Sequence, residues 1–168
     1  MLFSGLHVGR YRLEHLIAQG GTSEVWSGRH RVLGNRRALK VLRPSSPAER
    51  TGLDGLPLQA TLQHDNVLPV LEIAELDDRP VLVMPLVEGP SLRATIADRT
   101  LSPGEARWLF TGILAGVEAV HAVGRVHCDL KPDNVLLVRD GDRIVPKLTD
   151  FGIATVLGEH EPAGWGTR

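Results

Sequence analysis

The sequence HCDLKPDN at residues 127–134 and the sequence DFG at residues 150–152 indicate the fold of this chain. Between them, Val135–Val138 and Pro146–Thr149 flank Asp140-Gly141, a dipeptide that is typical of a β-hairpin turn. A short hairpin returns the chain to where it started. We therefore expect the last residue of the first stretch to lie close to the first residue of the second.

The polar side chains of these two stretches are the ones that phosphoryl transfer from a nucleotide requires. The reaction needs a carboxylate that orients the attacking hydroxyl, oxygen ligands for magnesium, and a cation that offsets charge on the transferring group. Asp129, the pair Asn134 and Asp150, and Lys131 are the right residue types for these three tasks. The sequence therefore predicts a phosphotransfer site in which Asn134 and Asp150 meet around a metal ion.

The first stretch resembles the catalytic loop of protein kinases, and Asp150-Phe151-Gly152 resembles the motif that follows it in that family. The resemblance implies that Asp129 is the catalytic base, that Lys131 contacts the γ-phosphate, and that Asn134 and Asp150 bind Mg²⁺. A lysine two residues after the catalytic aspartate resembles the serine/threonine branch rather than the tyrosine branch. ATP is then the expected cofactor, and a protein with a Ser or Thr hydroxyl is the expected substrate.

Residues 17–25, IAQGGTSEV, resemble the glycine-rich loop of bacterial kinases related to the eukaryotic family. Glycines in such a loop let backbone N–H groups approach phosphates without a clash from Cβ. Ala18 and Ser23 replace two of the usual glycines, so we expect a stiffer loop rather than a blocked one. Downstream, Lys40 resembles the strand-borne lysine that pairs with the α- and β-phosphates.

Residues 81–89, VLVMPLVEG, resemble the strand and hinge that bind adenine in kinases. By this resemblance, Met84 lines the back of the pocket and Leu136 forms its floor. Pro85 has no N–H, so the hinge donor is expected at Val87. The full set of expected nucleotide-binding residues is Ile17, Gly20, Gly21, Val25, Ala38, Lys40, Met84, Val87 and Leu136.

The pattern along the chain predicts strands first and helices later. Glycine turns divide residues 11–42 into short strands, which indicates an antiparallel sheet. Val67–Leu76 and Pro80–Met84 are predicted to be two further strands, and Ser91–Asp98 a short helix. A longer helix is predicted from Ser102-Pro103-Gly104-Glu105, because serine can cap it, proline suits its first position and glutamate completes a capping box.

These elements predict an α+β protein with the two-lobed fold of kinases. The expected lobes are residues 1–88, with an antiparallel β-sheet, and residues 89–168, which form a partial, helix-rich C-terminal lobe. Gly166-Thr167-Arg168 resembles the Gly-Thr that precedes the Ala-Pro-Glu motif of the family, and we expect the chain to be truncated before that motif. Apolar surface is expected where the later helices of the family dock.

Composition excludes several other classes of protein. Nineteen Lys and Arg against twenty Asp and Glu give a net charge of −1, which predicts neither nucleic acid nor an anionic membrane surface as a partner. Cys128 is the only cysteine, so neither a disulfide framework nor a zinc cluster is expected. The chain shows no signal peptide and no apolar run of the ~18 residues that a membrane span needs. The expected location is the cytoplasm.

Two positions depart from the pattern of an active kinase. Gly55 stands where the family has a glutamate that pairs with the strand lysine, so weak positioning of Lys40 is expected. Cys128 stands where many kinases carry an arginine that binds a phosphate on the activation segment. We therefore expect little activation by phosphorylation of Thr155 or Thr167.

Two alternatives to an active protein kinase remain open. The first is a nucleotide-binding pseudokinase or regulatory module, which keeps Lys40, Asp129 and Asp150 but transfers little phosphate. The second is a small-molecule phosphotransferase of the aminoglycoside-kinase type, which shares a His-x-Asp loop with a downstream Asn. Members of that class usually lack a lysine at the place of Lys131 and an intact DFG, so the protein kinase is preferred.

Overall fold

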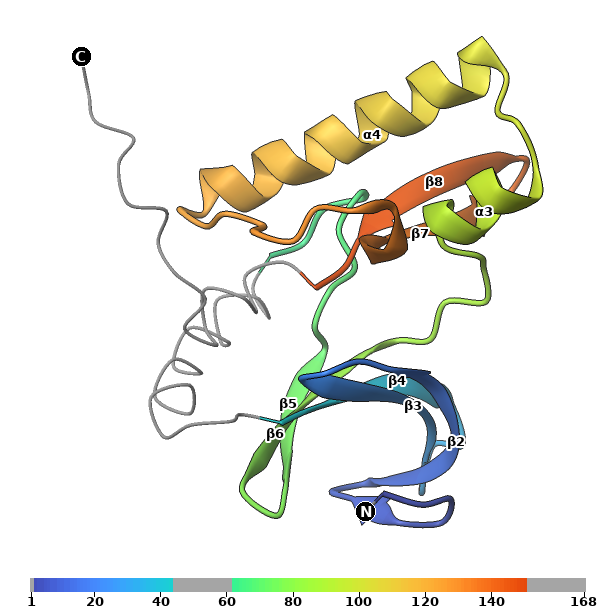
Figure 1. Cartoon of the computed structure of the whole chain (residues 1–168). Helices are drawn as coiled ribbons and strands as arrows, with labels where there is room; N and C mark the ends of the chain where they lie inside the picture. The colour runs from blue at the N-terminus through green and yellow to red at the C-terminus, as the bar shows by residue number, and fades with distance from the viewer. Residues whose placement is uncertain (1, 44–61, 151–168) are drawn as a thin grey trace.

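The computed structural model describes residues 2–43 and 62–150. Figure 1 shows an antiparallel sheet in one part of the molecule and a helix lying over a β-hairpin in the other. The sheet has the order β1-β2-β3-β4-β6-β5, and each neighbouring pair is antiparallel, as the sequence predicts. Its strands are β1 (His7–Val8), β2 (Tyr11–Gln19), β3 (Ser23–His30), β4 (Arg36–Leu42), β5 (Glu72–Leu76) and β6 (Arg79–Pro85).

The second part consists of α3 (Leu92–Asp98), α4 (Pro103–Ala122), the 3₁₀-helix η2 (Pro132–Asn134), β7 (Val135–Asp140) and β8 (Arg143–Leu148). The predicted hairpin is present as β7 and β8, with Asp140 opposite Arg143. Its turn is therefore Gly141-Asp142, one residue later than predicted, and Gly141 adopts a φ of +57° that glycine accommodates without strain. No helix that the structure describes is long and apolar enough to span a lipid bilayer.

The start of α4 has the capping box that the sequence predicts. The Ser102 hydroxyl accepts a hydrogen bond from the Glu105 N–H at 3.2 Å, and the Glu105 carboxylate accepts one from the Ser102 N–H at 2.9 Å. The bond from Arg99 and the bonds to Ser102 lower the pKa of Glu105 to about 2. Gly124, with φ +71°, lies just beyond the helix and allows the chain to turn away.

Gly112 and Gly116, one turn apart on α4, let the helix pack closely on its neighbours. A Cβ atom at Gly112 would lie 2.6 Å from the ring of Pro146, and one at Gly116 would lie 2.7 Å from the carbonyl oxygen of Asn66. The Asn66 side chain in turn donates a hydrogen bond to the Pro146 carbonyl at 2.9 Å. The low intrinsic helix propensity of glycine is therefore offset by contacts that a larger residue would prevent.

The predicted strand Val67–Leu76 is wrong in its first half, because β5 begins only at Glu72. Val67 forms a parallel bridge with Leu148 of β8, and the Leu68 N–H donates to the Leu148 carbonyl at 2.8 Å. Leu71 instead donates to Val83 of β6. The segment therefore crosses from the hairpin to the sheet. Its first residues bond with β8, and its later residues bond with β6.

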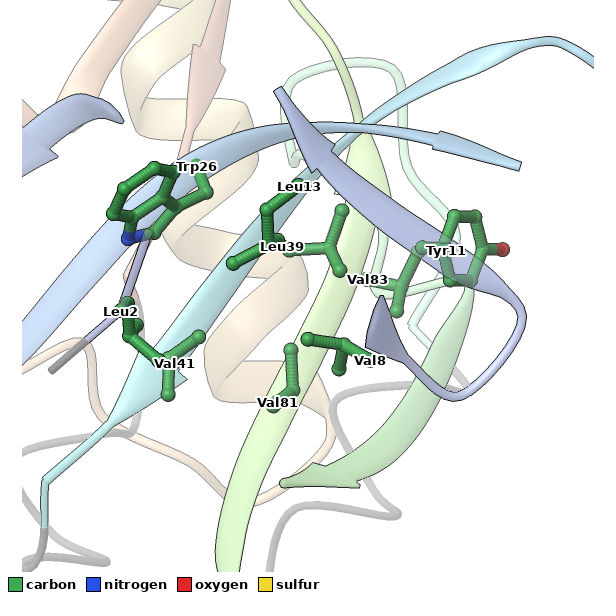
Figure 2. Packing of buried hydrophobic residues seen from close by; sticks show 9 residues of the cluster. All are labelled: Leu2, Val8, Tyr11, Leu13, Trp26, Leu39, Val41, Val81 and Val83. Carbon is green, nitrogen blue, oxygen red and sulfur yellow. The ribbon is translucent and has the colours of Figure 1, made fainter. Parts of the chain in front are cut away.

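The sheet buries apolar side chains on both faces, as the alternation along β4 requires. Leu39 and Val41 lie on one face, where the N-terminal residues Leu2 and Val8 cover them (Figure 2). Figure 2 labels the whole of this cluster: Leu2, Val8, Tyr11, Leu13, Trp26, Leu39, Val41, Val81 and Val83. The opposite face carries a second cluster, to which β7 contributes, and this is the face that holds the candidate site.

Apolar side chains are exposed on α4. Phe110 and Leu114, one helical turn apart, are 61% and 52% exposed. Large apolar side chains on an exposed helix face usually mark a surface that contacts another segment or another molecule.

Candidate active site

Five of the predicted nucleotide-binding residues lie together in one apolar cluster. Ala38 and Met84 are buried and directly opposite each other across β4 and β6. Val25, Val87 and Leu136 are partly buried and pack against the same cluster. Because Leu136 belongs to β7 and the other four belong to the sheet or its end, the cluster joins the two parts of the molecule.

The other predicted residues of the nucleotide-binding set lie at the edge of this cluster or beyond it. Ile17 on β2 is 46% exposed and is not among the residues packed in the cluster. Gly20 and Gly21 form the turn between β2 and β3, where the Gly20 N–H donates to the Ser23 carbonyl at 2.9 Å. The cluster has five further members that are not among the residues predicted from the sequence: Leu42, Leu68, Val70, Leu82 and Leu86.

Alternation along the strands could have identified two of these missed residues. Leu42 lies four residues after Ala38, and Leu82 two residues before Met84, so each shares a face with its partner. No sequence signal identifies Leu68 and Val70, because they belong to the segment that crosses between the hairpin and the sheet.

Lys40 and Asp150 form an ion pair that connects β4 with the end of the hairpin. The distance between Nζ and Oδ1 is 2.7 Å, and the side chains are 7% and 27% exposed. Asp150 has a φ of +66°, an unfavourable backbone conformation for a residue other than glycine. The Thr149 hydroxyl also donates to Asp150 Oδ1, at 3.3 Å. Two predicted site residues from distant parts of the sequence are thus in direct contact.

Asp129, Lys131 and Asn134 form a second polar group, centred on the Asp129 carboxylate. Asp129 Oδ2 accepts hydrogen bonds from Lys131 Nζ at 2.6 Å and from Asn134 Nδ2 at 2.9 Å. Burial raises the pKa of Asp129, but the bonds from Lys131 and Asn134 outweigh it, so the net pKa lies below the ordinary value. The bond to Asp129 raises the pKa of Lys131.

The hairpin brings Asn134 close to Asp150, as the sequence predicts. β7 begins immediately after Asn134, and the Thr149 N–H donates to the Asn134 carbonyl at 3.0 Å. Asn134 Nδ2 donates to Asp129, so the amide oxygen of Asn134 points away from Asp129. That oxygen and the Asp150 carboxylate fit the oxygen ligands that Mg²⁺ prefers.

His127 and Cys128 precede this polar group. The His127 side chain is only 3% exposed, and burial lowers its pKa, which favours the neutral imidazole. Cys128 is exposed and has a φ of +62°. Gly55, Thr155, Thr167 and the last two residues of the DFG stretch lie outside the described residues, so the expectations about them stay predictions.

A separate hollow lies on the other side of the hairpin. Its volume is about 990 Å³, and α3, α4 and the β7–β8 hairpin line it, with Trp108 and Ile144 among its apolar residues. The indole N–H of Trp108 donates to the Ile144 carbonyl at 2.7 Å, which holds α4 against β8. The hollow includes none of the predicted site residues.

Known proteins resemble this chain over nearly its whole length. The protein kinase domain profile matches residues 11–167. Serine/threonine-protein kinase Pkn1 of Myxococcus xanthus is 31% identical over 163 residues, which are 94% of this chain and 23% of that protein. Probable serine/threonine-protein kinase PknB of Lactococcus lactis is 34% identical over 156 residues, which are 89% of this chain and 24% of that protein.

Solved structures also resemble this chain. The PknI kinase domain of Mycobacterium tuberculosis superposes with a TM-score of 0.76 at 29% identity. The superposition covers 92% of this chain and 64% of the PknI chain. The present chain therefore spans about a quarter of the length of the two curated relatives and less than two thirds of the PknI structure.

Proposed function

The chain belongs to the protein kinase family, and from this premise we propose that it binds ATP with Mg²⁺ and transfers the γ-phosphate to Ser or Thr hydroxyls of a protein. The expected two-lobed α+β fold of that family is confirmed. The observation that carries the proposal is that the predicted phosphate and metal residues lie in two groups, in which Lys40 contacts Asp150, and Asp129 contacts Lys131 and Asn134.

In this proposal the adenine base lies against the apolar cluster between the sheet and β7. Ala38 and Met84 from the sheet and Leu136 from β7 provide apolar contact on two sides of a flat ring. The backbone N–H of Val87 donates the hydrogen bond that Pro85 cannot. Ile17 and the glycines of the β2–β3 turn cover the ribose and phosphates, where the absence of Cβ atoms allows close approach.

Asp129 is proposed to orient the hydroxyl that attacks the γ-phosphate. Its lowered pKa keeps the carboxylate ionised at neutral pH, so it can accept a hydrogen bond from the incoming hydroxyl. A loose transition state asks mainly for positioning and charge stabilisation, so a strong base is not required. Lys131 contacts Asp129 and is proposed to offset negative charge on the transferring group.

Asn134 and Asp150 are proposed to hold Mg²⁺ through their side-chain oxygens. A bound ion would supply positive charge that neutralises part of the charge on the phosphates. Lys40 lies on the same Asp150 carboxylate, so it is close enough to move to the phosphates when a nucleotide enters. In this proposal, nucleotide binding replaces the Lys40–Asp150 ion pair with contacts from Lys40 to the phosphates and from Asp150 to the metal ion.

The boundary between the lobes is proposed to lie at Glu88-Gly89, with residues 1–88 and 89–168 on its two sides. The sheet ends at Pro85 and α3 begins at Leu92. Any side chain at Gly89 would overlap the carbonyl of Leu137, so the connection passes tightly against β7. Because ATP is the proposed donor, the cytoplasm is the proposed location.

A second candidate is a nucleotide-binding module with little transfer activity. Cys128 favours it, because a cysteine cannot bind the activation-segment phosphate that an arginine binds at this position in many kinases. The two candidates predict the same binding site and differ only in turnover.

Transfer of labelled γ-phosphate from ATP and Mg²⁺ to a generic basic protein tests the proposal. We expect transfer by the parent chain and a loss of about 10²–10⁴-fold in Asp129→Asn, the range typical of a lost acid–base group. Asp133→Asn is the matched control, because Asp133 is half-exposed and pairs with Arg93 rather than with the site. Binding of ATP without transfer would support the second candidate, and the absence of both binding and transfer would contradict both.

A further inference from the structure

The strands at the start of the chain carry a charge that the whole-chain balance conceals. Residues 2–43 contain eight Arg and Lys but only two Glu, whereas the whole chain has a net charge of −1. The excess gathers around the turn that joins β3 to β4. We call this region the basic turn surface and define it by Arg12, Arg29, Arg31, Val32, Leu33 and Arg36.

The tip of the turn presents two aliphatic side chains to solvent. Val32 is 86% exposed and Leu33 is 70% exposed, more than any other large apolar residue that the structure describes. The turn is held firmly, because Nδ1 of His30 accepts hydrogen bonds from both the Val32 and the Leu33 N–H groups, at 3.2 and 3.1 Å. His30 itself is buried and packs edge-on against the ring of Tyr11. The backbone of the apolar tip is thus fixed to the sheet by hydrogen bonds.

Arginine side chains surround this tip. An open hollow of about 770 Å³ beside it is lined by Arg12, Arg29, Arg31 and Arg36. The Glu14 carboxylate bridges two of them, accepting from Arg29 Nε at 2.7 Å and from Arg36 Nε at 2.9 Å. Arg12 and Arg31 form no ion pair within residues 2–43 and 62–150. Two of the four guanidinium groups thus share one carboxylate, and Arg12 and Arg31 have no acidic partner within the described residues.

We propose that the basic turn surface docks the chain on an anionic phospholipid bilayer. Val32 and Leu33 enter the boundary between headgroups and acyl chains, and the arginines behind them contact lipid phosphates. A bilayer fits better than other polyanions, because its deformable acyl-chain region can bury the exposed apolar side chains at the tip of the turn. A nucleic acid backbone offers no such medium, and an acidic peptide would need an apolar groove, whereas the hollow here is lined mainly by polar and charged residues.

This mode of docking leaves the phosphate-binding end of the sheet open. The basic turn surface follows His30, the last residue of β3, while the glycine turn precedes Ser23, its first residue. The two ends are separated by roughly 23 Å, given about 3.3 Å per residue. The proposal is independent of phosphate transfer, because it uses no residue of the candidate active site.

Co-sedimentation of the full chain with vesicles tests the proposal. The chain should bind vesicles of phosphatidylcholine mixed with phosphatidylserine, and not vesicles of phosphatidylcholine alone. Val32→Ser with Leu33→Ser should lower the partition coefficient at least about tenfold. Arg12→Gln with Arg31→Gln should lower it roughly 30-fold and reduce its dependence on salt.

Two double variants serve as matched controls. Phe110→Ser with Leu114→Ser removes exposed apolar residues of α4, and Arg107→Gln with Arg139→Gln removes exposed charges of the other lobe. Both should bind vesicles like the parent, and all variants should show the parent's circular dichroism. Absence of binding by the parent, equal binding to neutral vesicles, or equal losses in controls and tip variants would each overturn the proposal. Binding of an acidic peptide or an RNA in place of vesicles would overturn it as well.

Discussion

Two lysine–aspartate pairs lie in the candidate site. Their N–O distances are nearly equal, but they differ in separation along the sequence and in exposure to solvent. Lys40 and Asp150 are 2.7 Å apart, come from distant parts of the sequence, and have side chains that are 7% and 27% exposed. Lys131 and Asp129 are 2.6 Å apart, only two residues from each other, and 49% and 46% exposed. The same chemical pair is thus long-range and largely buried in one place, and local and half-exposed in the other.

The difference indicates what each pair does. A buried pair loses hydration, so removal of one partner leaves a charge that the protein cannot easily stabilise. An exposed pair is screened by water and salt and contributes little to the free energy of unfolding. The Lys40–Asp150 pair therefore supports the contact between sheet and hairpin, whereas the Lys131–Asp129 pair mainly sets the protonation of one carboxylate.

The largest effect on stability is expected from Lys40→Met. It removes one partner of the buried pair, and because Asp150 is partly exposed, we expect a cost of about 2–3 kcal/mol, below that of a fully buried pair. Urea unfolding of the parent and the variant measures it. Arg37→Met, three residues earlier on β4, is the control and should cost less. Equal midpoints for Lys40→Met and the parent would show that the pair does not support the fold.

Nucleotide should stabilise the parent, because it replaces the Lys40–Asp150 contact with contacts to phosphates and metal. At ten times the dissociation constant of ATP with Mg²⁺, the expected gain is about 1.4 kcal/mol. A thermal unfolding scan with and without nucleotide measures the gain. Lys40→Met should show a smaller gain at the same nucleotide concentration. An equal gain in the variant would mean that Lys40 does not contact the nucleotide.

Lys131→Met should change stability by less than about 1 kcal/mol but should raise the pKa of Asp129. In the parent, that pKa lies below the ordinary value of 3.8. The stabilisation from ionised Asp129 is therefore present above the ordinary value and is lost as pH falls through the lowered one. Carbon NMR titration of the Asp129 carboxyl group should show the rise. A carboxyl pKa unchanged by the substitution would contradict the assignment of Lys131 as its main partner.

The smallest expected effect is the response of the two lysine–aspartate pairs to salt. Raising the ionic strength should remove most of the stability difference between the parent and Lys131→Met, which is a few tenths of a kcal/mol for an exposed pair. The difference between the parent and Lys40→Met should persist. Denaturant titrations at low and high NaCl measure both. An equal response to salt would mean that burial does not separate the two pairs.

The sequence predicted the local features of the site well. The turn dipeptide Asp140-Gly141 predicts the hairpin that joins Asn134 to Asp150, and the capping residues at Ser102 predict the start of α4. These features depend on neighbouring residues, which is why pattern and turn chemistry were enough.

Features that depend on packing between distant segments could not be predicted in this way. Nothing near Lys40 in the sequence indicates that its partner in the structure is Asp150. The segment after Asn66 was assigned to one strand, although it bonds first to β8 and then to β6. The basic turn surface was hidden as well, because an overall charge near zero gives no information about where the charges lie.

Titration calorimetry of ATP binding tests the assignment of Lys40 to the nucleotide phosphates and of Asp150 to the metal ion. We expect ATP binding to depend on Mg²⁺. Lys40→Met should weaken it by about tenfold or more, the value of a charge-assisted hydrogen bond. Asp150→Asn should reduce the dependence on Mg²⁺, and Asp129→Asn should leave binding nearly unchanged. Equal ATP affinity with and without Mg²⁺, or equal affinity in Lys40→Met and the parent, would contradict this assignment.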